Sequence, residues 1–329
     1  MRSFDYIRPA TVTLAVEQAS RVEGARFVAG GTTIFDLMKL EIEAPSSLID
    51  VTVITGFDSI ESSDGGLVIG ALARMADVAD HPAVRERYPA LCESLWKAAS
   101  QQLRNMATVG GNLLQRTRCP YFRGGAPYAC NKRAPGSGCA AAGGNDRGLA
   151  LFGASEACRA NYPGDWAVAL VAFDAEAEIV GTAGVRWIKV EDMYRDPGDT
   201  PEIETVLRPG DFITRIRVPA IGASRASTYH KIRDRESYAF ALTSAAVAVA
   251  FDGERIGEAR IALGGVGARP LRARAAKAVL SGKPFTPALA LEAGRTAFLG
   301  ARTSEHNAFR VPLGIETVAD ALRIAVERA

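Results

Sequence analysis

The sequence predicts an α+β protein, in which a binding domain of two small α/β units precedes a three-stranded antiparallel sheet with helices. Three observations support this fold class. Short apolar strands alternate with helical patterns over residues 1–115. A stretch rich in Gly, Pro and Cys interrupts this pattern at 116–161. From Thr228 onward, three strands come before three helices, an order that favours an α+β domain.

The composition excludes several classes of protein. The 329 residues are 48% hydrophobic and 23% charged, and a net charge of +2 gives no indication of nucleic acid or an anionic membrane. The longest apolar run, Ala239–Phe251, is shorter than the roughly 20 residues that a membrane span requires. The N-terminal MRSFDYIRPA has no apolar segment typical of an export signal, so we expect no signal of the chain's own.

The first unit is predicted over residues 1–55 and the second over 56–222. In the first, helical and strand patterns alternate at Thr11–Ala19, Arg26–Ala29, Thr33–Leu40 and Ser47–Val51. The second contains a helix with one apolar face, and its main elements are expected at Gly66–Ile69, Leu91–Ala99, Asp165–Phe173, Ala177–Val180 and Phe212–Val218.

A C-terminal domain is predicted over residues 223–329, after a boundary in the polar segment IGASRAS. Its three strands are expected at Tyr229–Ile232, Leu242–Phe251 and Glu258–Leu263. Its three helices are expected at Arg272–Ser281, Pro287–Leu299 and Pro312–Arg328.

Two glycine-centred loops are candidates for ligand binding. The first, FVAGGTTIFDLMK at Phe27–Lys39, is an apolar strand, two glycines, two threonines and a helix. Glycines let a ligand approach the backbone, and the amides at a helix start can bind phosphate. The second, ATVGGNLLQ at Ala107–Gln115, repeats the paired glycines. Together the loops could clamp a pyrophosphate, although the first is equally compatible with a simple turn whose threonines cap the helix. Neither contains the G-x-G-x-x-G fingerprint, so a Rossmann dinucleotide site is not predicted.

Four of the five cysteines lie in the stretch 116–161, which holds eight glycines and three prolines and little hydrophobic periodicity. A long irregular segment needs something other than a core to order it, and a thiolate-bound metal centre can do so. Gaps of 10, 8 and 18 residues separate Cys119, Cys130, Cys139 and Cys158. This spacing does not choose between iron–sulfur and zinc, and unrelated buried thiols remain an alternative. Cys92 lies on an apolar helix and is expected to be a core residue.

The two loops resemble the flavin-binding loops of the FAD (medium) subunits of the xanthine dehydrogenase and carbon monoxide dehydrogenase family of molybdenum hydroxylases. The likeness extends over nearly the whole chain, through YPGDWAVALVAFDA (162–175) and STYHKIRDRESYAFALTSAAVAV (227–249). It implies that residues 1–222 form a two-part FAD-binding domain, with the FAD pyrophosphate cradled at Ala29–Ile34. The FAD-binding residues that it implies are Phe27, Val28, Ala29, Gly30, Gly31, Thr32, Thr33, Ile34, Thr108, Gly111, Asn112, Asp165 and Lys231.

Two of these residues have specific implied roles. By the resemblance, Asp165 bonds the ribityl chain of FAD and Lys231 lies near the flavin ring. The alternative for Asp165 is a cap on the helix that follows it. The alternative for Lys231 is an exposed basic residue on a strand edge. Tyr194 lies in the loop where relatives place an aromatic ring over the isoalloxazine.

The amino-acid sequence around the four cysteines shows a second resemblance. RCPYFRGG, YACNK, PGSGCAA and SEACRA are similar to the inserted cluster loop of the FAD subunit of the periplasmic aldehyde oxidoreductase type, and more loosely to that of 4-hydroxybenzoyl-CoA reductase. The resemblance implies a [4Fe–4S] cluster on Cys119, Cys130, Cys139 and Cys158. Zinc stays the alternative.

The function implied is electron transfer within a heterotrimeric aldehyde-oxidising complex. A large partner would hold the molybdenum cofactor, a small partner [2Fe–2S] centres, and an external acceptor would take electrons from FAD. The alternatives are a flavin subunit of a xanthine dehydrogenase-like or aromatic acyl-CoA reductase complex, a zinc-organised scaffold without redox activity, or a stand-alone FAD oxidoreductase. Assembly is expected in the cytoplasm, with co-export to the periplasm on a partner's signal as a further possibility.

Overall fold

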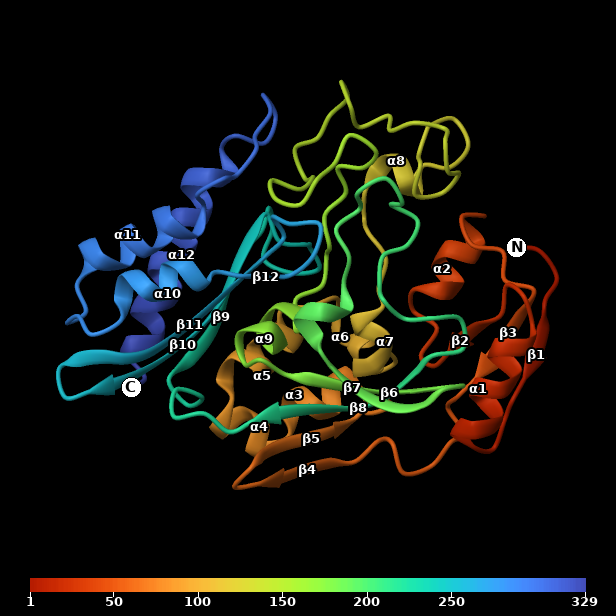
Figure 1. Ribbon diagram of the computed structural model, residues 1–329, viewed down its shortest axis with the longest axis horizontal. Coiled ribbons are helices and arrows are strands. Elements are labelled where there is room, and N and C mark those ends of the chain that lie inside the picture. The colour runs from red at the N-terminus through yellow and green to blue at the C-terminus, as the bar shows by residue number, and fades with distance from the viewer.

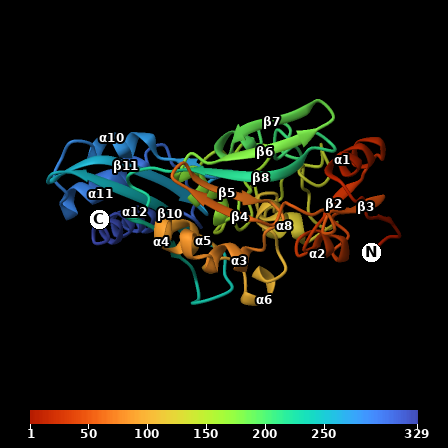
Figure 2. The ribbon, with the colours of Figure 1, turned by 90° about the horizontal axis from the view of Figure 1, so that it is seen from below.

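The computed structural model describes residues 1–329 and contains three sheets (Figure 1). A three-stranded sheet forms the N-terminal end, a five-stranded sheet lies in the middle, and a four-stranded sheet with its helices forms the other end (Figures 1 and 2). None of the helices has the length and apolar character needed to cross a membrane.

The first unit is a small parallel α/β layer with strand order β1-β3-β2. Its elements are β1 (Asp5–Ile7), α1 (Val12–Arg21), β2 (Arg26–Val28), α2 (Ile34–Lys39) and β3 (Ser47–Asp50). Helix α1 begins where the Thr11 side chain accepts a hydrogen bond from the Leu14 N–H, and it buries Ala15, Val16 and Ala19 against the sheet. The predicted α/β unit is present, and β1 is an addition to the predicted elements.

The second unit is an antiparallel sheet of order β4-β5-β8-β6-β7. Its strands are β4 (Ile60–Ser63), β5 (Gly66–Gly70), β6 (Glu176–Gly181), β7 (Gly184–Lys189) and β8 (Phe212–Pro219). The accompanying helices are α3 (Met75–Asp80), α4 (Pro82–Arg87), α5 (Pro89–Trp96), α6 (Gln101–Arg104), α7 (Val109–Leu113), α9 (Trp166–Ala172) and the 3-10 helix η1 (Val190–Met193). Helix α9 is buried along its whole length, and Cys92 on α5 belongs to the same core, as predicted.

The insertion at 116–161 has one short helix, α8 (Pro120–Arg123), and is otherwise irregular, as its composition predicts. In Figure 1 it lies along one side of the molecule, between the C-terminal sheet and α2. Ion pairs connect it to both units. Arg116 bonds Glu43 of the first unit and Glu204 of the second, and the Lys132 ammonium lies 2.9 Å from Glu204.

The C-terminal domain has an antiparallel sheet of order β12-β11-β10-β9. The elements are β9 (Ser227–Ile232), β10 (Thr243–Asp252), β11 (Arg255–Gly264), β12 (Leu271–Arg272), α10 (Arg274–Leu280), α11 (Pro287–Ala297) and α12 (Arg310–Val326). The prediction of three strands was therefore wrong by one. Strand β12 has only two residues, too few to show the alternation by which a strand is identified.

Candidate cofactor site

The first glycine loop, which directly follows β2, contains a run of backbone N–H groups that have no hydrogen-bond partner in the protein. None of the five N–H groups from Ala29 to Thr33 donates a hydrogen bond to another group of the chain. Four of these five residues are partly exposed, so their N–H groups are open to water or to a ligand, and five free donors in succession suit the binding of an anion. Phe27 and Val28 pack into the hydrophobic clusters of the first unit and position the start of this loop.

The two glycines of this loop are required by the packing around them. A Cβ on Gly30 would overlap the carbonyl oxygen of Met106, and a Cβ on Gly31, at φ +69°, would overlap the ring of Phe35. Gly30 thus brings the first loop into backbone contact with the segment that leads into the second loop.

The threonines do not cap α2. Thr33 occupies the N-cap position, but its hydroxyl makes no capping hydrogen bond and its φ of −104° and ψ of −48° are helical. The hydroxyl of Thr32 makes no hydrogen bond within the protein either, and both threonines are partly exposed. The capping interpretation of this loop was therefore wrong, and the two hydroxyls are free to bind a ligand.

The amides of the second loop, in contrast, are used within the protein. The N–H groups of Val109 and Gly110 bond the carbonyl oxygens of Ala73 and Ala71, and the hydroxyl of Thr108 accepts from the Gly111 N–H at 3.3 Å. The second loop therefore offers fewer free amides than the first, and a pyrophosphate clamp formed by both loops stays a prediction. The bonds to Ala71 and Ala73 hold α7 against the chain that follows β5.

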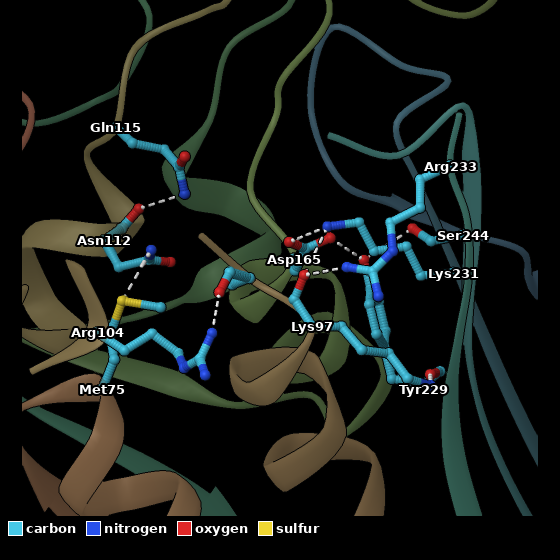
Figure 3. Close-up of polar contacts among 11 residues, drawn as sticks. Met75, Lys97, Arg104, Asn112, Gln115, Asp165, Tyr229, Lys231, Arg233 and Ser244 are labelled. Atoms are coloured by element: carbon cyan, nitrogen blue, oxygen red, sulfur yellow. Dashed lines mark hydrogen bonds and ion pairs between the residues drawn. The ribbon is translucent and has the colours of Figure 1, made fainter. Parts of the chain in front are cut away.

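One polar atom of the second loop has no partner. The amide nitrogen of Asn112 lies 3.4 Å from the sulfur of Met75 (Figure 3), whereas its Oδ1 is buried without a hydrogen bond. Gly111 is exposed, and a Cβ there would contact only the Thr108 hydroxyl. An orphaned acceptor beside an open backbone position again indicates a ligand surface.

Asp165 and Lys231, separated by 66 residues in the sequence, form a buried ion pair with 2.8 Å between Oδ2 and Nζ (Figure 3). The side chain of Lys231 is only 1% exposed, so its interpretation as an exposed edge residue was wrong. Asp165 precedes α9 without capping it through its side chain, so the capping alternative was also wrong.

Further groups extend this pair into a network that the sequence did not indicate. The Tyr229 hydroxyl donates to Oδ1 of Asp165 at 2.5 Å and lies 2.9 Å from the Ser244 hydroxyl (Figure 3). Burial and the negative charge of Asp165 raise the pKa of Tyr229 well above its ordinary value, so Tyr229 stays a donor. Lys231 also donates to the carbonyl oxygen of Lys97 at 2.9 Å. The network joins the end of α5, the start of α9 and β9.

The four cysteines of the insertion line one largely apolar pocket. Cys119, Cys130 and Cys158 are buried, Cys139 is partly exposed, and an isolated bridge pairs Cys130 with Cys139. Burial raises the pKa of Cys119 to about 11. No three His, Cys, Asp or Glu side chains converge closely enough to hold a single metal ion. Four thiols that line one pocket have the chemistry of a metal-binding site.

A larger hollow adjoins this pocket on the side of the second unit, and the two share Lys132, Cys158 and Ala160. Tyr194 lines the hollow but is 8% exposed. Its hydroxyl lies 3.1 Å from that of Tyr162 and donates to the Leu113 carbonyl at 3.0 Å. Leu113 directly follows Asn112, so the hollow lies between the cysteine pocket and the second glycine loop.

Two sequence families match the chain. The FAD binding domain in molybdopterin dehydrogenase matches residues 2–221, and the CO dehydrogenase flavoprotein C-terminal domain matches residues 227–321. The first match covers more than half of the chain. The protein therefore belongs to the family of FAD-binding subunits of molybdenum hydroxylases, of the aldehyde oxidoreductase and CO dehydrogenase type.

Individual relatives agree with this assignment. The chain is 47% identical to the aldehyde oxidoreductase FAD-binding subunit PaoB of Escherichia coli, with both chains covered completely. It is 24% identical to the glyceraldehyde dehydrogenase medium chain of Sulfolobus acidocaldarius, covering 85% of this chain and 82% of that one. A carbon monoxide dehydrogenase structure from Hydrogenophaga pseudoflava superposes with a TM-score of 0.79 at 25% identity, covering 100% and 99% of the two chains.

Proposed function

We propose that this chain is the FAD- and [4Fe–4S]-carrying electron-transfer subunit of a heterotrimeric molybdenum hydroxylase that oxidises aldehydes to carboxylic acids. The observation that carries the proposal is the 47% identity, over the full length, to an aldehyde oxidoreductase subunit. A large partner holds the molybdenum cofactor, and a small partner holds the [2Fe–2S] centres that supply electrons. FAD, when bound, accepts electrons singly and releases them as a pair to an external acceptor.

In this proposal, residues of the first unit (1–55) and of the second unit (56–222) together bind FAD. In this proposal the unpaired amides from Ala29 to Thr33 bond diphosphate oxygens, and the free hydroxyls of Thr32 and Thr33 add donors. Phe27, Val28 and Ile34 shape the two ends of this loop. From the second loop, Asn112 supplies its orphaned Oδ1, while Thr108 and Gly111 form the wall beside it.

The buried ion pair gives the proposed flavin site a fixed polar wall. Each carboxylate oxygen of Asp165 accepts one bond within the protein and keeps a lone pair for a ribityl hydroxyl. The ammonium of Lys231 is held by Asp165 and by the Lys97 carbonyl. A buried positive charge beside the flavin ring favours negative charge on that ring, which supports its role as an electron acceptor.

We assign the [4Fe–4S] cluster to Cys119, Cys130, Cys139 and Cys158. All four come from one insertion with little core of its own, and all four line one pocket. A [4Fe–4S] cluster takes one thiolate at each of its four irons, and four cysteines at one pocket meet this requirement.

The experiment that tests the function uses the assembled complex. The chain is co-produced with a molybdenum-binding partner and a [2Fe–2S] partner, and aldehyde-dependent reduction of an artificial acceptor is measured. We expect turnover by the complex and essentially none by the chain alone. If the isolated chain turned over aldehyde as fast as the complex does, the subunit assignment would be contradicted. It would also be contradicted if the chain bound neither of the two partners.

A further inference from the structure

Two arginines of the insertion, Arg118 and Arg123, carry buried donor atoms without partners. The Nε of Arg118 and the Nη1 of Arg123 are inaccessible to solvent and make no hydrogen bond. Their side chains as a whole are 25% and 20% exposed, so each guanidinium lies at the edge of an open surface. Unsatisfied buried donors on charged groups are costly, and nearly all such atoms in folded proteins have a partner.

The charges around these donors are unbalanced. Both guanidinium groups share a single carboxylate oxygen, Oδ2 of Asp36, which is 3.5 Å from Arg118 and also bonds Arg123. The Asp36 side chain is 42% exposed. The exposed ring of Phe240 lies 5.0 Å from the Arg118 guanidinium. Two cations, one partly exposed anion and unused planar donors form a site that attracts a further anion.

The position of this pair relates it to the first glycine loop. Asp36 lies in the first turn of α2, three residues after Thr33, which belongs to the run of unpaired amides. At 1.5 Å of rise per residue, that separation is about 4.5 Å along the helix. Arg118 directly precedes Cys119, and Arg123 lies on α8, which begins after Cys119. The insertion thus brings two positive charges to the first turn of α2, the helix that directly follows the bare loop.

We propose that Arg118 and Arg123 bind the diphosphate of FAD together with the amides of the first glycine loop. This inference rests on the proposed FAD site. A guanidinium fork matches two phosphate oxygens, and each arginine keeps a donor nitrogen that no protein group uses. The insertion therefore contributes directly to flavin binding in addition to holding its own cluster.

A different explanation is that the arginines only clamp α8 to α2 through Asp36. The two explanations differ in what Asp36→Asn should do. If the pair is a clamp, Asp36→Asn and the arginine variants have the same effect. If the pair is an anion site, Asp36→Asn removes a competing carboxylate and leaves FAD affinity unchanged or higher.

The test titrates the full-length chain, stripped of flavin, with FAD and with riboflavin, which has no phosphate. We expect Arg118→Gln and Arg123→Gln each to raise the Kd for FAD about tenfold or more, with the Kd for riboflavin unchanged. The lysine variants keep the charge and should lose less. Arg217→Gln, which removes an exposed pair with Glu176 on the central sheet, is the control and should bind FAD normally.

Two results would overturn the inference. One is wild-type FAD affinity in both glutamine variants. The other is a parallel loss of FAD and riboflavin binding in the arginine and Asp36→Asn variants, which would identify a structural clamp. Failure of the wild-type chain to bind either flavin would instead overturn the proposed FAD site itself. Circular dichroism spectra identify any variant that does not fold. If a glutamine variant does not fold, the FAD and riboflavin affinities of the corresponding lysine variant are compared with those of the wild type instead.

Discussion

Gly30 touches the backbone of Met106, whereas a Cβ on Gly111 would meet only the Thr108 hydroxyl, at 3.0 Å. The two glycines therefore have different roles, although each belongs to a Gly-Gly pair. A side chain at Gly30 would separate the two loops, while a side chain at Gly111 would project toward the proposed ligand surface.

This difference predicts separate effects on stability and on binding. Gly30→Ala should lower the free energy of unfolding of the flavin-free chain by about 1–3 kcal/mol, because Met106 has to move. Gly111→Ala should leave this stability within about 1 kcal/mol of wild type and raise the Kd for FAD. Chemical denaturation and FAD titration measure the two quantities. Equal destabilisation by both substitutions would contradict the assigned roles.

The Asp165–Lys231 pair predicts strong coupling between its members. Lys231→Met leaves a buried carboxylate without its cation and should destabilise the chain by about 3–5 kcal/mol. Adding Asp165→Asn removes the unpaired charge and should recover part of that loss. Urea denaturation of the two single variants and the double variant gives the coupling energy. Additive losses would show that the two side chains act independently.

At the scale of elements, burial decided what could be predicted from the sequence. Strand β10 and helix α9 are buried almost throughout, so their apolar runs identify them. Strands β4 and β7 are largely exposed and show no apolar alternation, and each is held by its hairpin partner, β5 or β6. The contacts that stabilise them are therefore absent from their own sequences.

The candidate site divides in the same way. The glycine loops and the cysteines carry local patterns, so they could be identified from the sequence. Tyr229 meets Asp165, and Lys97 meets Lys231, only after folding, because these partners come from distant segments. The orphaned donors of Arg118 and Arg123 likewise depend on tertiary contacts, since Asp36 lies over 80 residues away. Their local sequence contains no signal for this arrangement.

The positions of the cysteines in the insertion predict which of them bind the metal. Cys130→Ser or Cys139→Ser should remove most of the iron and make residues 116–161 sensitive to protease, since the segment has little core to order it. Cys92→Ser is the matched control, because this thiol lies in the separate core beside α9. Iron per chain and limited proteolysis are the measurements. Equal iron loss in all three variants would overturn the assignment of ligands.

At the scale of the whole molecule, the insertion connects the proposed cluster to the flavin half of the chain. Arg116 bonds both units, Lys132 bonds the second unit, and Arg118 and Arg123 reach α2. Any ligand that orders the insertion therefore also positions charges at the first glycine loop. The two cofactors are expected to stabilise each other's binding.

This coupling has a direct consequence for the cysteine variants. Cys130→Ser, which removes no group from the glycine loops, should raise the Kd for FAD because the disordered insertion no longer holds Arg118 and Arg123 in place. Riboflavin affinity should change less, since it lacks the diphosphate. Fluorescence titration of the iron-free variant measures both. Unchanged FAD affinity after complete loss of iron would show that the insertion and the flavin site are independent.

The central claim is that one chain holds both FAD and a [4Fe–4S] cluster. Its most direct test is the cofactor content of the purified chain after production in a host that builds iron–sulfur clusters. We expect about one FAD, four irons and four acid-labile sulfides per chain. A colourless chain with zinc in place of iron and sulfide, and with no flavin, would contradict the account.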